Sequence, residues 1–316
     1  MFLDVVIFIV ALSVLIYGAD FIINESEKIA LKFGISEYII GATLIALGTS
    51  LPEMAASINA SINGKPELSI SNIVGSNILN ITLVLGLVFI LAKKINPNRD
   101  FFKKDSAWAL FPVLIFIVAI LNGKISRFTG FVFMLLMGAY ILFITRHDKD
   151  VIDLADIDKE ELQKSFSWAK SIPLLILGFL MVVYGADYTV SSASNIAKFF
   201  GVSDWVIGVV LVALGTSMPE LVVSVSAAVK GKADMAIGNI IGSNMANITI
   251  AVGAAAVANP IAIDFSKYTF DIVTMLVATL MLVFITVNKM YSKPSGISLL
   301  ILLAIFMEHT INSVIQ

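Results

Sequence analysis

The chain has 316 residues, of which 58% are hydrophobic and only 14% are charged, and its formal net charge is −2. Soluble domains carry about 25% charged residues, so this composition excludes an ordinary soluble domain. The nearly neutral charge gives no indication of nucleic-acid binding. The absence of cysteine excludes disulfides, thiolate metal sites and cysteine nucleophiles.

Ten apolar segments approach or exceed the length of about 20 residues that a membrane-spanning helix needs. The first carries Asp4 in place of a basic start, so we interpret it as a retained helix rather than a cleaved signal. The fourth is short, and the second and seventh are unusually long. The segments are 3–23, 36–63, 69–92, 106–121, 127–145, 168–192, 203–229, 236–257, 267–287 and 295–314. We therefore predict an all-α polytopic membrane protein with ten transmembrane helices.

One long polar stretch, 146–167, separates the fifth segment from the sixth. Its acidic residues Asp148, Asp150 and Asp153 do not have the spacing of an EF-hand loop, and no glycine occupies the turn position. We interpret the stretch as a solvated linker.

Lysine and arginine residues are unevenly distributed between the two sides of the membrane. If the N-terminus is outside, sixteen of the 21 fall on the cytoplasmic side and five outside, and the outer five are Lys65, Lys124, Arg127, Lys198 and Lys267. Cytoplasmic loops normally hold the excess of basic residues. We therefore predict a multi-pass protein of the cell membrane with both termini extracellular and the linker cytoplasmic.

The chain contains an internal repeat, which appears when the sequence is aligned with itself so that Tyr17 falls on Tyr184. Thirty-three of the 70 positions from Tyr17 to Gly86 are identical to their counterparts in this gapless alignment. The first repeat, 1–145, and the second, 168–316, each contain five predicted helices, and this odd number inverts the second relative to the first. Inverted repeats are typical of secondary transporters, whose substrate site lies near the bilayer midplane between the repeats.

The sequence ALGTSLPE at 46–53 returns as ALGTSMPE at 213–220, and each copy places a glutamate in the middle of an apolar helix. Intramembrane carboxylates are costly and usually line an ion path. Pro52 lacks the amide hydrogen that would bond to the Gly48 carbonyl, so we expect a broken helix with free carbonyl oxygens. The polar residues that share a helix face with the glutamates are Thr49 and Ser50 beside Glu53, and Thr216 and Ser217 beside Glu220.

A second repeated motif, NIVGSNILN at 72–80 and NIIGSNMAN at 239–247, adds further oxygen donors. Ser76 and Asn80 share one face of their helix, as do Ser243 and Asn247. Hard cations such as Ca²⁺ and Na⁺ prefer oxygen ligands. Either motif alone would also fit a helix kink or a tight helix contact, but both occur twice at one spacing, which favours a cation site.

These paired motifs resemble the two α-repeats of the calcium/cation antiporter superfamily, in particular its prokaryotic sodium/calcium exchanger-like branch. The resemblance covers essentially the whole chain. It implies that helices 2, 3, 7 and 8 form a core over which helices 1 and 6 slide. It also implies an ion-ligand set of Glu53, Glu220, Thr49, Thr216, Ser50, Ser217, Ser76, Ser243, Asn80 and Asn247, with backbone carbonyls of Ala46 and Ala213.

Two departures from the family pattern affect the expected ion specificity and regulation. Position 247 is Asn, where several members, including potassium-dependent ones, have Asp. The linker is too short to hold the large cytoplasmic regulatory domains of animal exchangers.

The sequence therefore predicts a secondary antiporter that exchanges Ca²⁺ for Na⁺ by alternating access. A proton-coupled Ca²⁺ antiporter and a cation channel remain alternatives. An intramembrane hydrolase would need a base beside Ser50 or Ser217, and no predicted core helix offers one. We expect no enzyme activity and no cofactor; the partners are the lipid bilayer and the transported Ca²⁺ and Na⁺, with no obligate protein partner evident. Asp20 and Asp187 lie late in helices 1 and 6. One interpretation is that they guide ions at the two mouths of the site; we favour the other, that they hold the helix ends in water.

Overall fold

The computed structural model describes residues 1–92, 95, 101–146, 166–202 and 213–315, and this part of the chain is almost entirely helical. The predicted linker, apart from its two ends, and the start of the predicted seventh helix, 203–212, lie outside the described residues. The elements of the first half are α1 (Phe2–Phe33), α2 (Glu37–Ile40), η1 (Gly41–Ile45), α3 (Ala46–Thr49), α4 (Leu51–Ile62), α5 (Pro66–Leu79), η2 (Asn80–Leu85), α6 (Gly86–Leu91), α7 (Phe101–Leu121), β1 (Lys124–Ile125) and α8 (Arg127–Arg146).

The described elements of the second half follow a similar order up to its third long helix. Its elements are α10 (Trp168–Phe199), α12 (Ala213–Thr216), α13 (Met218–Val229), α14 (Ala233–Ala246), η5 (Asn247–Ala251), α15 (Val252–Ala258), β2 (Ile261–Ala262), η6 (Phe265–Tyr268), α16 (Thr269–Val287) and α17 (Lys293–Ile315). Here η1, η2 and η5 are π-helical, and η6 is a 3₁₀ turn.

Helices lie at all ten predicted positions, although they are not ten equivalent spans. Within the described residues, seven helices are individually long and apolar enough to cross a membrane, and an eighth span is the bent pair formed by Glu37–Thr49 and Leu51–Ile62. Ala107–Leu121 and Met218–Val229 are shorter apolar helices. The molecule is a multi-pass membrane protein.

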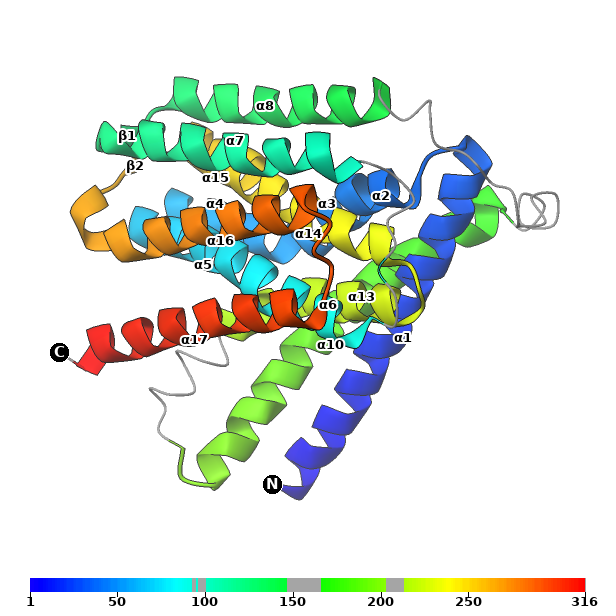
Figure 1. The fold of residues 1–316 in the computed structure, drawn as a ribbon. Coiled ribbons are helices and arrows are strands. Elements are labelled where there is room, and N and C mark those ends of the chain that lie inside the picture. The colour runs from blue at the N-terminus through cyan, green and yellow to red at the C-terminus, as the bar shows by residue number, and fades with distance from the viewer. Residues whose placement is uncertain (93–94, 96–100, 147–165, 203–212, 316) are drawn as a thin grey trace.

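Helices α1 and α10 run side by side and obliquely to the rest of the molecule (Figure 1). Each has 32 residues, or about 48 Å at 1.5 Å per residue, which exceeds the hydrocarbon thickness of about 30 Å. The predicted ends at 23 and 192 are therefore too early. A Cβ atom added to Gly18 would lie 2.9 Å from the Gly178 carbonyl oxygen, so only glycine permits this close approach.

The remaining helices pack around α14, which is buried along nearly its whole length. It contacts α2, η1 and α3 of the first half. A Cβ atom added to Gly242 would lie 2.3 Å from the Ala42 carbonyl oxygen, and one added to Gly238 would lie 2.4 Å from the Tyr38 carbonyl oxygen. Small residues thus bring the backbones of the two halves together, as is usual between membrane helices.

Loops that are predicted to lie on the same side of the membrane contact one another in the structure. On the predicted outer side, β1 pairs antiparallel with β2, and the Lys267 ammonium lies 3.6 Å from the Glu67 carboxylate. On the predicted inner side, Lys232 forms ion pairs with Glu27 and Glu37. These contacts agree with the predicted order of crossings.

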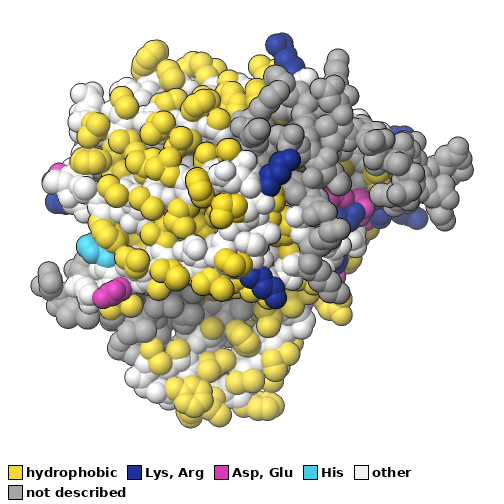
Figure 2. Space-filling model, in the orientation of Figure 1, with side chains coloured by type: hydrophobic (Ala, Val, Ile, Leu, Met, Phe, Trp, Pro, Cys, Tyr) yellow, Lys and Arg dark blue, Asp and Glu magenta, His cyan; other side chains and the backbone are white. Residues whose placement is uncertain are grey.

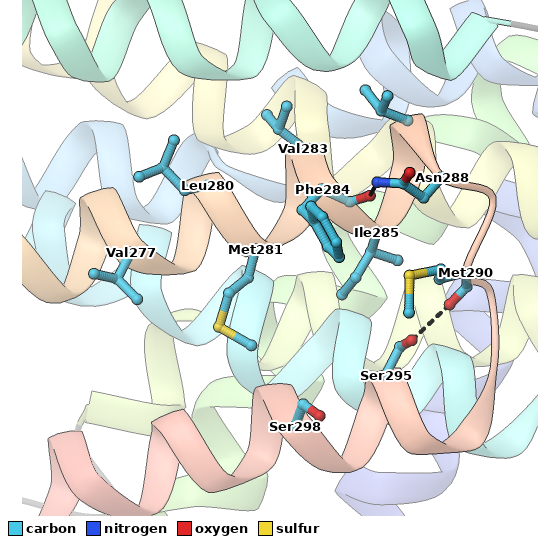
Figure 3. Close-up of a pocket in the computed structure, with 11 residues that line it drawn as sticks. Val277, Leu280, Met281, Val283, Phe284, Ile285, Asn288, Met290, Ser295 and Ser298 are labelled. Atoms are coloured by element: carbon cyan, nitrogen blue, oxygen red, sulfur yellow. Dashed lines mark hydrogen bonds between the residues drawn. The ribbon is translucent and has the colours of Figure 1, made fainter.

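The surface is largely apolar, and charged side chains are sparse on the face that Figure 2 shows. Exposed large side chains on α7, α8 and α10 include Val118, Leu135 and Leu180. Such a surface suits contact with lipid tails. A groove of about 720 Å³ along α16 and α17 is lined mainly by apolar residues such as Leu280 and Phe284 (Figure 3). None of its lining residues belongs to the predicted cation site.

Candidate functional site

Both predicted helix breaks are present, and each lies next to its glutamate. Helix α3 ends at Thr49 and α4 begins at Leu51, with a bend of 47° between the helices on the two sides of the break. Ser50 has non-helical dihedrals of φ −84° and ψ 2°. In the second half Ser217 separates α12 from α13 with φ −87° and ψ 4°. Because Pro52 and Pro219 fall in the first turn of the following helix, they are tolerated there.

The two glutamates are buried in the first turns of α4 and α13. Glu53 is 1% exposed and Glu220 is fully buried. Ser50 donates a hydrogen bond of 2.8 Å to the Oε1 atom of Glu220, which links the two halves at the breaks. The other oxygen of Glu220 and both oxygens of Glu53 have no hydrogen-bond partner among the described residues.

The asparagines of the second motif lie where α-helix changes to π-helix. Asn80 begins η2 and Asn247 begins η5, and single π-turns of this kind are frequent at functional sites. Both side chains are at most 1% exposed. Their amide nitrogens donate hydrogen bonds, whereas their Oδ1 atoms have no partner in the part of the chain that the structure describes.

The serines of the site complete a set of buried oxygen atoms. Ser76 and Ser243 are buried, and so are Ser50 and Ser217. Within the described residues, seven buried oxygens of the predicted site have no hydrogen-bond partner: Glu53 Oε1 and Oε2, Glu220 Oε2, Asn80 Oδ1, Asn247 Oδ1, Ser217 Oγ and Ser243 Oγ. Buried polar atoms are normally paired, so this many unpaired oxygens from four helices suit a dehydrated hard cation.

The remaining predicted ligands are less uniform. Thr49 is fully buried, and its hydroxyl donates to Asn239 Oδ1 at 3.3 Å, whereas Thr216 is only half-buried. The Ala46 carbonyl accepts the Ser50 amide at 3.1 Å, and the Thr49 hydroxyl also lies 3.4 Å from it. Ala213 is the first residue of α12.

The prediction did not include four neighbouring asparagines that form hydrogen bonds in and beside the predicted site. Asn72 donates to Ser57 at 2.9 Å, and Asn239 donates to Ser224 at the same distance. Asn77 and Asn244 bond to Asn247 and Asn80 across the two halves. All four of these asparagines belong to the repeated NIxGSNxxN motif, and that repetition was the available signal.

A bundle of membrane-spanning helices, built from two related halves with buried carboxylates between them, defines a secondary transporter for cations. The chain belongs to the sodium/calcium exchanger protein family, whose profile matches residues 3–146 and 170–311.

Known relatives match over most of the chain. The sodium/calcium exchanger MaX1 of Methanosarcina acetivorans is 33% identical, and the match covers 95% of this chain and 96% of the relative. An uncharacterised membrane protein of Methanocaldococcus jannaschii is 39% identical over 78% of this chain and 80% of its own length. A solved structure of the sodium–calcium exchanger NCX_Mj superposes with a TM-score of 0.82 at 33% identity, covering 98% of this chain and 99% of the other.

Proposed function

We propose that this protein exchanges Ca²⁺ for Na⁺ across the cell membrane by alternating access. The observation that carries the proposal is the pair of buried glutamates, one from each half, whose unpaired oxygens lie next to helix breaks within the membrane. Two carboxylates balance one Ca²⁺ or two Na⁺. Because both cations would need the same glutamates, their competition would couple the two fluxes.

The proposed ligands are the two glutamates together with the hydroxyl, amide and carbonyl oxygens of the helix breaks and π-turns. Burial supports ten of the twelve positions directly: Ala46, Thr49, Ser50, Glu53, Ser76, Asn80, Ser217, Glu220, Ser243 and Asn247. The breaks are preceded by Thr49 and the Ala46 carbonyl in one half and by Thr216 and the Ala213 carbonyl in the other. These groups would form sodium sites that flank the central one.

The proposed flanking sodium sites would make the exchange electrogenic, because they allow a third Na⁺ to bind. With two carboxylates, Ca²⁺ occupancy of the central site is neutral, and a third Na⁺ adds one positive charge. Exchange of three Na⁺ for one Ca²⁺ moves one net charge per cycle. Such a charge couples to the membrane potential at about 2.3 kcal/mol per 100 mV.

The orientation that we propose places both termini outside the cell and the linker in the cytoplasm. The sixteen-to-five distribution of basic residues supports it. Because the chain has no cysteine, a single cysteine introduced into the linker can be labelled selectively in intact cells. Labelling by an impermeant reagent added outside would contradict this orientation.

The function is tested by measuring calcium-45 uptake into liposomes that contain the purified protein. An outward Na⁺ gradient should drive uptake, and a pH gradient of equal size should not. Uptake driven by the pH gradient alone would indicate proton coupling, and non-saturating flux without any counter-ion would indicate a channel.

The same liposomes test the third Na⁺. When three Na⁺ leave for each Ca²⁺ that enters, one positive charge leaves per cycle. Uptake should therefore be faster when the interior is clamped positive than when it is clamped negative. Equal rates at the two potentials would exclude the third Na⁺.

A further inference from the structure

Four asparagines form a reciprocal hydrogen-bond set between the two halves. Asn80 Nδ2 donates to Asn244 Oδ1 at 3.0 Å, and Asn247 Nδ2 donates to Asn77 Oδ1 at 3.1 Å. In addition, Asn244 Nδ2 donates to the Asn77 carbonyl at 3.3 Å, and Asn77 Nδ2 donates to the Asn244 carbonyl at 3.5 Å. The internal repeat aligns Asn77 with Asn244 and Asn80 with Asn247, so the set is symmetric between the halves.

A carboxamide presents an oxygen at one end and two N–H donors at the other, and only its partners decide which end faces a given direction. The Oδ1 atoms of Asn77 and Asn244 can only accept, so each one binds the NH₂ group of its partner. The Oδ1 atoms of Asn80 and Asn247 are thereby turned away and remain buried without a partner within the described chain. A side chain with its oxygen and nitrogen exchanged would present N–H groups to a cation and repel it.

We propose that Asn77 and Asn244 are positioning residues that orient the amide oxygens of Asn247 and Asn80 toward the transported cation. The inference rests on the proposed function, because it assumes that Asn80 and Asn247 are ligands. Each positioning residue acts on the ligand of the opposite half.

A purely packing role would involve the same contacts, so the test must separate orientation from packing. Asn77→Leu keeps the approximate size of the side chain and removes the acceptor for Asn247. Mutation of a group that orients a metal ligand typically reduces affinity by about 10–100-fold. We expect a rise of on the order of tenfold in the KM for Ca²⁺, with a maximal flux within about twofold of the parent.

The decisive measurement is a double-mutant cycle with Asn247→Asp. An aspartate has two equivalent oxygens and presents one to the cation in either orientation. Asn77→Leu should therefore raise KM in the parent and have little effect when position 247 is Asp. Asn80→Asp is the matched control, because within the described residues the Asn77 side chain forms no hydrogen bond with Asn80. In that background Asn77→Leu should still raise the KM for Ca²⁺. If Asn77→Leu raised the KM for Ca²⁺ by the same factor in all three backgrounds, the proposal would be overturned.

The equivalent double-mutant cycle with Asn244→Leu tests the proposal if the Asn77→Leu variant does not fold. Asn244→Leu should raise KM in the parent and in the Asn247→Asp background, but not in the Asn80→Asp background. Thermal unfolding in detergent checks that each variant folds. If Asn80→Asp and Asn247→Asp leave Ca²⁺ and Na⁺ affinities unchanged, the ligand assignment itself is wrong. If they change affinity but the cycles show no coupling, only the positioning role is wrong.

Discussion

Ser50 and Ser217 occupy the same position in two nearly identical helix breaks, but their environments differ. Ser50 donates to Glu220, whereas the Ser217 hydroxyl and both oxygens of Glu53 have no hydrogen-bond partner among the described residues. Two inverted halves of a single chain cannot both occupy the same environment when the molecule opens to one side. The difference shows how a symmetric sequence yields an asymmetric site, and the opposite-facing state should exchange the two roles.

A second asymmetry concerns the ion pairs that tie α1 to the core. Lys230 bonds to Asp20 at 2.6 Å, and Lys232 bonds to Glu27 and to Glu37, the latter at 2.8 Å. Asp20 is thus ion-paired within a longer helix and does not solvate a helix end. Burial opposes the charge of Lys232, but Glu37 and Glu27 outweigh it and raise the pKa of Lys232 above its ordinary value.

Among the described residues, the first half shows no equivalent of this ion-pair cluster. Asn63 replaces Lys230 in the repeat, and Lys65, which corresponds to Lys232, forms no ion pair within the described part of the chain. The cluster therefore stabilises α1 against the core on one side of the membrane. It is a candidate for setting the resting balance between the two states.

The largest effect is expected from replacing the buried glutamate that each half contributes to the site. Glu53→Gln and Glu220→Gln should each reduce calcium-45 exchange by at least about 100-fold, because each removes one of the two charges that balance Ca²⁺. Glu67→Gln, on the exposed surface, is the control and should retain near-parental flux. Near-normal exchange by either buried variant, with unchanged thermal stability, would disprove the site assignment.

Much of this architecture could be predicted because it depends on local rules. Prolines after GTS predict the breaks, and the gapless internal alignment predicts the paired halves. The length of α1 could not be predicted. The predicted segment ended at residue 23, but the structure continues the helix to Phe33, and Glu25 pairs with Lys28 at 2.6 Å within it. The ion pair between Glu27 and Lys232 adds a tertiary contact to this part of the helix, which the local sequence pattern does not reveal.

The asymmetry of the site could not be predicted either. The motifs around Ser50 and Ser217 differ in sequence at a single position, Leu51 against Met218. Which serine bonds to which glutamate depends on the conformation of the whole molecule. The roles of Asn77 and Asn244 depend on contacts between segments from opposite halves of the chain, which helical spacing does not reveal.

A smaller effect should distinguish the two serines. Ser50→Ala removes a hydrogen bond to a charged group, which is typically worth about 1.5–3 kcal/mol, so it should raise the KM for Ca²⁺ by about tenfold or more on one side of the membrane. Ser217→Ala should have its main effect on the opposite side. Oriented proteoliposomes with Ca²⁺ varied on one side at a time provide the measurement. Equal changes on both sides for each variant would contradict the exchange of roles.

A still smaller effect is expected from the ion-pair cluster. Lys232→Gln should shift the balance between the two states by about threefold, since exposed or half-exposed ion pairs contribute up to about 1 kcal/mol. Spin labels on cysteines introduced at Asn24 and Asn63 would report the displacement of α1 relative to the core as a second distance population. Lys65→Gln is the matched control and should leave the populations unchanged. Identical distributions in both variants would exclude a role for the cluster in setting the balance.

The smallest expected effect is that of potassium, and it concerns the neutral asparagines at positions 80 and 247. Neutral Asn80 in one half corresponds to neutral Asn247 in the other, so the site has two carboxylates and no third charge for an additional monovalent ion. Sodium-driven Ca²⁺ uptake should therefore change by less than about 20% when K⁺ is replaced by N-methylglucamine, because a site without the extra charge gains little from K⁺.

The membrane potential in that experiment should be clamped with a protonophore at equal pH, so that removing K⁺ does not alter the driving force. Asn247→Asp places a third carboxylate in one half only. It should change the preference among monovalent ions while thermal stability stays near that of the parent. A strict K⁺ requirement in the parent protein would show that a neutral pair of asparagines is sufficient for a potassium site, and the charge argument would then fail.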